Sequence, residues 1–193
     1  MVERPPLSEK FHRALVYAAR LHSRQFRKGT TRPYVGHLLG VASLVLQSGG
    51  TEEEAIAALL HDAVEDQGGQ KTLLEIRKRF GPRVAKIVEG CSDSDTIPKP
   101  PWRERKEKYI TEVASAPASV RLVSAADKLY NAREVLADYR LHRDAVWSRF
   151  SGGKHGTLWY YREMEKALRA TGGTPLVDEL DRVVTELERL AMH

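Results

Sequence analysis

A histidine and an aspartate stand side by side in an apolar helical segment, Leu59-Leu60-His61-Asp62-Ala63-Val64-Glu65-Asp66. A helix that buries Leu60 and Val64 gains nothing structural from an imidazole and three carboxylates beside them. Burying such groups without compensation costs free energy. A divalent metal is the simplest compensating partner, since histidine nitrogens and carboxylate oxygens are its usual ligands. The alternative is a solvated acidic turn at a helix end, with His61 hydrogen-bonded in the core.

A second histidine opens a neighbouring helix, which we predict from about Tyr34 to Gln47. Apolar residues follow His37 four, seven and eight positions later, so its side chain points toward the core. A lone histidine on an apolar face is usually a hydrogen-bonded core residue. Here, however, a short turn makes this helix the antiparallel neighbour of the next one. We therefore expect His37 to approach His61 and Asp62.

A fourth candidate, Asp127, lies at the edge of the buried stripe of a helix predicted from Ser119 to about Tyr139. Asn131 follows one turn later and projects from the same face. A carboxylate at such a position needs a cation or several hydrogen-bond donors. An ion pair of Asp127 with Lys128 or Arg133 is the structural alternative.

Two imidazoles and two carboxylates without sulfur suit a divalent ion such as Mn²⁺, Fe²⁺, Zn²⁺ or Mg²⁺, with solvent in the remaining positions. A bound ion lowers the pKa of a coordinated water and polarises a phosphoryl oxygen. Glu65 shares the helix face of His61 and Asp62, and Asp66 follows Asp62 by four residues. Either carboxylate can orient or deprotonate the attacking water while the other protonates the leaving group. As plain helix-end charges, both would oppose the helix dipole.

Nearly every segment of the chain predicts a helix, and no window alternates as a strand does. Thr51 with Glu54 and Thr72 with Glu75 form two capping-box patterns, and Pro82 opens a further helix. The other helices are predicted at 8–25, 34–47, 102–114, 119–139, 157–170 and 176–192. We therefore expect an all-α fold, a single compact helical bundle over residues 1–193. Its motif core covers about 8–165 and its C-terminal helix about 176–192.

Composition limits the class of protein further. The 193 residues are 41% hydrophobic and 30% charged, which is ordinary for a soluble globular domain. The net charge of +5 comes from basic residues interleaved with acidic ones, and it suits a phosphorylated small molecule as well as nucleic acid. A single cysteine, Cys91, excludes an internal disulfide and a thiolate zinc site. Without a long apolar run or a secretory pattern, we expect a cytoplasmic protein with no membrane partner.

The order of these residues resembles the HD phosphohydrolase superfamily, with His37, then His61-Asp62, then Asp127. Four longer motifs resemble the hydrolase domain of Rel/SpoT alarmone enzymes and the small alarmone hydrolases, over roughly residues 8–165. They are Gln25-Phe26-Arg27-Lys28, Pro33-Tyr34-Val35-Gly36-His37, Ala57 to Asp66, and Ala126 to Arg133. The resemblance implies an all-helical enzyme that usually uses Mn²⁺ and removes the 3′-diphosphate of guanosine tetra- or pentaphosphate.

The same resemblance implies residue roles. The implied metal ligands are His37, His61, Asp62 and Asp127, and the implied catalytic carboxylates are Glu65 and Asp66. The implied substrate-binding residues are Arg27 and Lys28 for phosphates, Asn131 for the nucleotide and, by a looser match, Lys154 and Tyr161. Glu134 stands where long Rel enzymes have a small polar residue, and segments 98–106 and 153–161 differ from those enzymes. These departures could reshape the pocket.

Other functions remain compatible with the same residues. The metal site would also suit an HD phosphatase that acts on a nucleoside monophosphate or on a 3′-phosphorylated dinucleotide. A nucleotide-sensing or nucleic-acid-binding module is a third hypothesis, but it needs no water-activating Glu65 and Asp66. A homodimer is possible. The aromatic run Trp159-Tyr160-Tyr161 is expected in the core, with a dimer interface or a base-stacking platform as alternatives.

Overall fold

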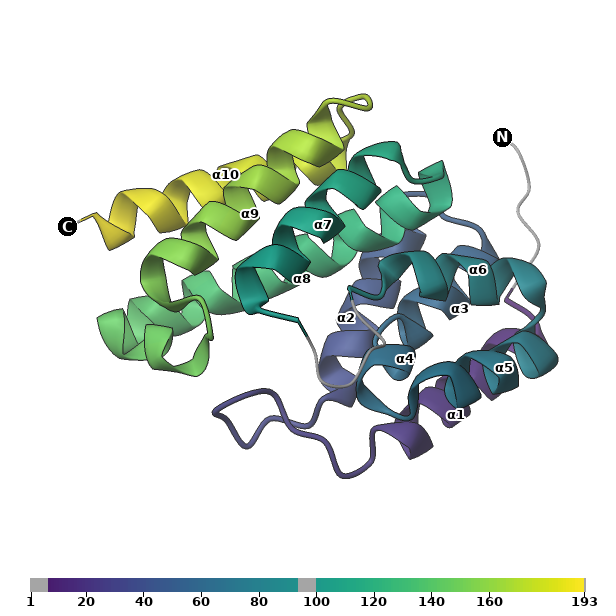
Figure 1. Ribbon diagram of the computed structural model, residues 1–193. Coiled ribbons are helices and arrows are strands. Elements are labelled where there is room, and N and C mark those ends of the chain that lie inside the picture. The colour runs from purple at the N-terminus through teal and green to yellow at the C-terminus, as the bar shows by residue number, and fades with distance from the viewer. Residues whose placement is uncertain (1–6, 94–99, 193) are drawn as a thin grey trace.

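The computed structural model of the protein describes residues 7–93 and 100–192, and in these ranges the secondary structure is helical (Figure 1). A single β-bridge between Phe26 and Pro33 is the exception. The predicted all-α fold is confirmed. The elements are α1 (Glu9–Leu21), α2 (Val35–Gln47), α3 (Glu52–Leu60), α4 (Ala63–Asp66), α5 (Gly69–Phe80), α6 (Pro82–Cys91), α7 (Trp102–Ser115), α8 (Ala118–His142), the 3₁₀ helix η1 (Arg143–Arg149), α9 (Gly153–Arg169) and α10 (Pro175–Ala191).

The long helix α8 runs through the middle of the molecule and organises the rest. It contacts α2, α3 and α6 on one side and α7, α9 and α10 on the other (Figure 1). Leu38 of α2, Leu60 of α3 and Leu129 of α8 are all fully buried where these helices meet. Burying an apolar side chain of this size contributes about 1.5–3 kcal/mol. The three helices that carry the candidate metal ligands therefore share one core.

Two of the three helix starts predicted from local signals are confirmed. Thr51 and Glu54 form a capping box at the start of α3, and Pro82 occupies the first turn of α6. The capping box predicted for Thr72 and Glu75 is wrong, because α5 already begins at Gly69. The Thr72 hydroxyl instead donates to the backbone oxygen of Gln67, at 2.6 Å. Gly68 and Gly69 adopt positive φ angles, which glycine tolerates, and the helix begins there, about one turn before the predicted capping box.

The His61-Asp62 pair is not in the middle of a helix, as the apolar pattern suggests. The helix α3 ends at Leu60, and the single-turn α4 starts at Ala63. The backbone of the pair keeps right-handed helical angles, so the chain continues in nearly the same direction. The metal-ligand candidates therefore sit at a helix junction. Likewise, α1 ends at Leu21 rather than Gln25, which leaves residues 22–25 outside the helix.

The helices α9 and α10 lie together against α8, on the side away from α1 and α5 (Figure 1). Arg162 of α9 joins them through ion pairs to Asp181 at 2.6 Å and Glu188 at 2.7 Å. The start of α9 is four residues earlier than predicted, at Gly153, while the predicted C-terminal helix differs by one residue at each end. Within the described residues, no helix is both long and apolar enough to span a bilayer.

Two glycines of α2 allow a matched test of helix packing. A Cβ built on Gly40 would lie 1.9 Å from Cε2 of Tyr130, whereas a Cβ on Gly36 meets no described atom within 4 Å. We expect Gly40→Ala to lower the free energy of unfolding by about 1–3 kcal/mol through overpacking. Gly36→Ala should raise it by up to about 1 kcal/mol, because alanine favours helix. Urea unfolding measures both, and equal stability of the two variants would contradict the close packing.

Candidate metal centre and active site

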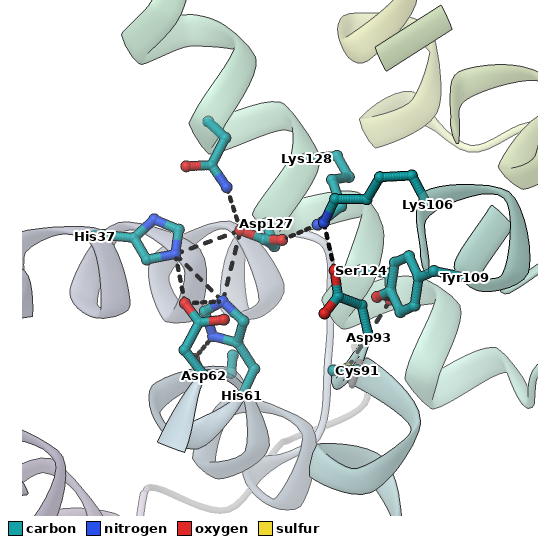
Figure 2. Close-up of polar contacts among 12 residues, drawn as sticks. His37, His61, Asp62, Cys91, Asp93, Lys106, Tyr109, Ser124, Asp127 and Lys128 are labelled. Carbon is teal, nitrogen blue, oxygen red and sulfur yellow. Dashed lines mark hydrogen bonds and ion pairs between the residues drawn. The ribbon is translucent and has the colours of Figure 1, made fainter. Parts of the chain in front are cut away.

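The four candidate metal ligands come together at one point (Figure 2). The Nε2 atoms of His37 and His61 are 3.2 Å apart. Asp62 Oδ2 lies 3.3 Å from His37 Nε2 and 3.0 Å from His61 Nε2. Asp127 Oδ1 lies 3.3 Å and 3.5 Å from the same two nitrogens. Residues from the start of α2, the α3–α4 junction and the middle of α8 thus meet, as the sequence predicts.

These spacings fit a shared cation. Metal–ligand bonds of about 2.1 Å place neighbouring donor atoms about 3.0–3.5 Å apart in tetrahedral or octahedral geometry. His37, His61 and Asp127 offer ligand atoms within 4.8 Å of one another, and all three residues are buried. Asp62 adds its Oδ2 between the two histidines. Two buried imidazole nitrogens and two carboxylates would be costly to hold this close without a positive charge between them.

The surrounding structure fixes the orientation of the histidines. His61 Nδ1 is 2.8 Å from the backbone oxygen of Ala58, so this nitrogen carries the proton and donates it. His61 Nε2 is therefore the nitrogen that faces the centre, where it would be the one to bind a metal ion, as in metal-ligating histidines. The ring of His37 meets the edges or faces of Tyr34 and Tyr130, at centroid distances of 5.3 Å and 5.2 Å. Packing and hydrogen bonding therefore aim both Nε2 atoms at one point.

The electrostatics of the centre favour a cation. Burial acts to lower the pKa of His61, but the adjacent Asp62 and Asp127 outweigh it and raise this pKa well above its usual value. Burial acts to raise the pKa of Asp62, but His61 and His37 hold it well below the usual range. Asp127 also accepts from Lys128, so the ion pair considered as an alternative is present together with the histidine contacts. The Arg133 side chain instead pairs with Glu179, at 3.2 Å.

The two candidate catalytic carboxylates face different cavities. Glu65 lines a cavity of about 170 Å³ together with Asp62 and Asp127. Asp66 lines an adjoining cavity of about 470 Å³. Its Oδ2 accepts a hydrogen bond of 2.7 Å from Gln25 Nε2. Glu65 thus shares a cavity with two of the metal ligands, and Asp66 faces the space large enough for a nucleotide.

Four of the five predicted substrate-binding residues line the larger cavity. They are Arg27, Lys28, Asn131 and Tyr161. Asn131 also connects this cavity to the metal centre, because it accepts from Arg27 at 2.5 Å and donates to Asp127 Oδ1 at 2.6 Å. Lys154 lies outside both cavities and pairs with Asp144 at 3.3 Å.

Two lysines that the sequence does not predict as substrate-binding residues lie at the junction of the cavities. Lys106 and Lys128 line both cavities, and their ammonium groups lie 4.8 Å and 5.7 Å from the ring centroid of Tyr160. Lys106 also pairs with buried Asp93 at 2.5 Å (Figure 2). The sequence shows Lys106 in a run of alternating charges, which is typical of a solvated helix. In the structure α7 packs against α9, and Lys106 lies beside Tyr160 of α9.

The two segments that differ from Rel enzymes do contribute to the larger cavity. Trp102 and Lys106 come from the first, while residues 98 and 99 lie outside the described ranges. Tyr160 and Tyr161 come from the second. Both tyrosines are buried and face the cavity, so the expected core position is confirmed for them. Trp159 is only partly buried, with the Arg103 guanidinium 3.3 Å from its ring centroid, so the prediction holds for it only in part. Glu134 lies at the same cavity and pairs with Arg32 at 2.7 Å.

Comparisons with known proteins agree with this geometry. Residues 14–158 match the HD domain family. The chain is 35% identical over 166 residues to human guanosine-3′,5′-bis(diphosphate) 3′-pyrophosphohydrolase MESH1. The aligned region covers 79% of this chain and 87% of MESH1. A guanosine-3′,5′-bis(diphosphate) 3′-pyrophosphohydrolase of Aquifex aeolicus is 36% identical over 162 residues, 75% of this chain and 23% of that protein. The solved structure of a metazoan ortholog of SpoT has a TM-score of 0.77 and 29% identity, covering 94% and 96% of the two chains.

The match to the HD domain family spans all four candidate ligands, from His37 to Asp127. Sequence motifs, helical architecture and the similarity to a solved structure thus agree. The chain belongs to the HD-domain family of metal-dependent phosphohydrolases and is homologous to MESH1 and to the SpoT/Rel hydrolases.

Proposed function

We propose that this protein is a metal-dependent hydrolase that removes the 3′-diphosphate of guanosine 3′,5′-bis(diphosphate). The observation that carries the proposal is the position of the centre formed by His37, His61, Asp62 and Asp127. Its cavity shares Lys106 and Lys128 with a nucleotide-sized cavity. The names of MESH1 and the Aquifex aeolicus relative, both 3′-pyrophosphohydrolases of this compound, support the same substrate.

The charge of the larger cavity supports a polyphosphate substrate. Arg27 and Lys28 lie on the loop between α1 and α2, and Lys106 and Lys128 lie at the junction with the metal centre. Guanidinium and ammonium groups bind phosphate oxygens through charge-assisted hydrogen bonds. A diphosphate that extends from the nucleotide cavity toward the metal ligands would meet cations along its length. The net surplus of basic residues then serves a small anion rather than a nucleic acid.

The roles of the residues follow from their places in the two cavities. A divalent ion held by the four ligands would supply an acidified water and a polarised phosphoryl oxygen. Glu65, which shares the smaller cavity with the carboxylate ligands Asp62 and Asp127, accepts the proton of the attacking water, and this proton is then passed to the departing 3′ oxygen. Asp66 helps to orient the reacting groups from the larger cavity. Lys106 and Lys128 bind the diphosphate and stabilise the charge that develops on its oxygens.

The finer points of the proposal are open to direct measurement. The resemblance to Rel/SpoT enzymes favours Mn²⁺ as the native ion, and the nitrogen and oxygen donor set is compatible with it. We treat the chain as one HD domain, because α10 packs on both α8 and α9. A cytoplasmic location and a possible homodimer stay predictions from the sequence.

A substrate panel tests the proposed activity. The purified protein with Mn²⁺ should release pyrophosphate from guanosine 3′,5′-bis(diphosphate) and from the pentaphosphate. It should act more slowly on GMP and on a 3′-phosphorylated dinucleotide, which lack a 3′-diphosphate. Chromatographic product analysis distinguishes these cases. A metal-loaded protein that prefers either of the latter substrates would assign a different HD phosphatase activity, and inactivity on the whole panel would refute the enzyme assignment.

Removal of one carboxylate ligand should abolish tight metal binding. Asp62→Ala deletes the oxygen that lies between His37 and His61. Because metal affinity depends on the complete ligand set, we expect the Mn²⁺ content and the calorimetric binding signal to be lost. The matched control is Asp178→Ala, which removes an exposed carboxylate from α10 and should leave Mn²⁺ binding unchanged. Undiminished Mn²⁺ affinity in Asp62→Ala would exclude Asp62 as a ligand.

Neutralising the proposed general base should separate binding from chemistry. Glu65→Gln keeps the shape of the side chain but cannot accept a proton from water. We expect Mn²⁺ affinity to persist while kcat falls by about 10²–10⁴-fold. Glu75→Gln, on the exposed face of α5, is the control and should retain full activity. If kcat of Glu65→Gln stays within a factor of two of the unmodified protein, another group activates the water.

A further inference from the structure

A buried histidine lies between the end of α1 and the candidate catalytic carboxylates. His22 is only 2% exposed, and its Nδ1 is 2.7 Å from Gln25 Oε1. Gln25 Nε2 in turn donates to Asp66 Oδ2, also at 2.7 Å. None of the roles assigned above uses His22 or Gln25. The short segment 22–25, which leaves the helix after Leu21, thus connects a core imidazole to Asp66.

Hydrogen-bond chemistry fixes the direction of this connection. An ionised Asp66 can only accept, so Gln25 must present its NH₂ group to it. Gln25 Oε1 then faces the interior, where it also accepts from Gln67 Nε2 at 2.6 Å. Burial lowers the pKa of His22, so the ring is neutral at neutral pH and has a single N–H. That proton must be on Nδ1, which donates to Gln25.

The same imidazole also supports a metal-ligand candidate. The His22 ring stacks on Tyr34, with centroids 5.4 Å apart and planes 18° apart. The Tyr34 hydroxyl donates to Asp62 Oδ2 at 2.5 Å. The buried ring of His22 therefore belongs to two chains of contacts. One passes through Gln25 to Asp66, and the other passes through Tyr34 to Asp62.

A purely structural role explains His22 poorly. Its Nε2 is buried and has no hydrogen-bond partner among the described residues. An unsatisfied buried acceptor costs free energy that an apolar side chain in the same space would avoid. The Nδ1 donor is the feature that an apolar residue could not supply, and it acts on Gln25.

We propose that His22 and Gln25 are positioning residues that hold Asp66 in a fixed orientation relative to Asp62. This inference rests on the proposed function, in which Asp66 is a catalytic carboxylate. Gln25 lies at the wall of the larger cavity, so the competing explanation is a direct contact between Gln25 and the substrate. The two explanations predict different kinetic effects, because an orienting contact acts on the chemical step and a substrate contact acts on binding.

The first test replaces the glutamine by a side chain of similar length without hydrogen-bonding groups. In hydrolysis of guanosine 3′,5′-bis(diphosphate) with Mn²⁺, Gln25→Met should lower kcat by about 10- to 100-fold with KM unchanged, because supporting hydrogen bonds typically contribute this much. Gln47→Met, on the exposed end of α2, is the control and should behave as the unmodified protein. A raised KM with unchanged kcat would show that Gln25 contacts substrate, and would overturn the inference.

Three further variants test whether the effect of Gln25→Met depends on Asp66 and whether His22 contributes to it. In an Asp66→Ala background, Gln25→Met should lower kcat less than about twofold, because the group it orients is gone. His22→Leu should lower kcat as Gln25→Met does. His22→Asn should recover most of the loss, since its amide can donate from about the position of Nδ1. The network would be contradicted if the effects of Gln25→Met and Asp66→Ala on kcat were additive. It would also be contradicted if His22→Asn had no higher kcat than His22→Leu.

Crystal structures of the variants with Mn²⁺ show the position of Asp66 directly, without a measurement of activity. The Asp66 carboxylate should keep its position in Gln47→Met and should be displaced or disordered in Gln25→Met. An unmoved Asp66 in Gln25→Met overturns the inference, whatever the activity. If the unmodified protein fails to hydrolyse guanosine 3′,5′-bis(diphosphate) but Asp66 moves in Gln25→Met, the positioning network stands and only the proposed function fails.

Discussion

The structure depends on a buried cluster of donor atoms whose charges must be compensated. Two imidazole nitrogens and two carboxylate oxygens lie 3.0–3.5 Å apart in the interior, between α2, the α3–α4 junction and α8. Desolvation of these groups opposes folding, and a divalent cation between them would offset that cost. The burial of apolar residues such as Leu38, Leu60 and Leu129 stabilises the packing of these helices, and this packing holds the four donor groups together.

The cavities extend this centre into an enzyme site. The smaller cavity is lined by Glu65 and by the two carboxylate ligands, Asp62 and Asp127, and the larger one adds basic side chains and two buried tyrosines. Lys106 and Lys128 line both cavities, so a phosphate group bound by them would lie close to Asp62 and Asp127. Asp66 faces the larger cavity from the one-turn helix α4, and it accepts a hydrogen bond from Gln25 there.

Most of the fold and the metal centre could be predicted from the sequence, because both depend on short-range patterns. Apolar periodicity located the long helices, and the spacing around His37, His61 and Asp127 indicated a shared ligand set. Helix junctions were less predictable. The break after Leu60 interrupts a continuous apolar pattern, and the α5 start depends on glycine conformations that outweigh the capping signal of Thr72. Lys106 was missed because its neighbours in sequence indicate solvent, while its neighbours in space come from α9.

Anomalous diffraction from a crystal of the protein soaked in Mn²⁺ tests the central claim most directly. The account predicts one strong anomalous peak about 2.1–2.3 Å from Nε2 of His37 and His61 and from carboxylate oxygens of Asp62 and Asp127. A fully loaded protein whose manganese lies elsewhere, with these four side chains joined only to one another, would contradict it.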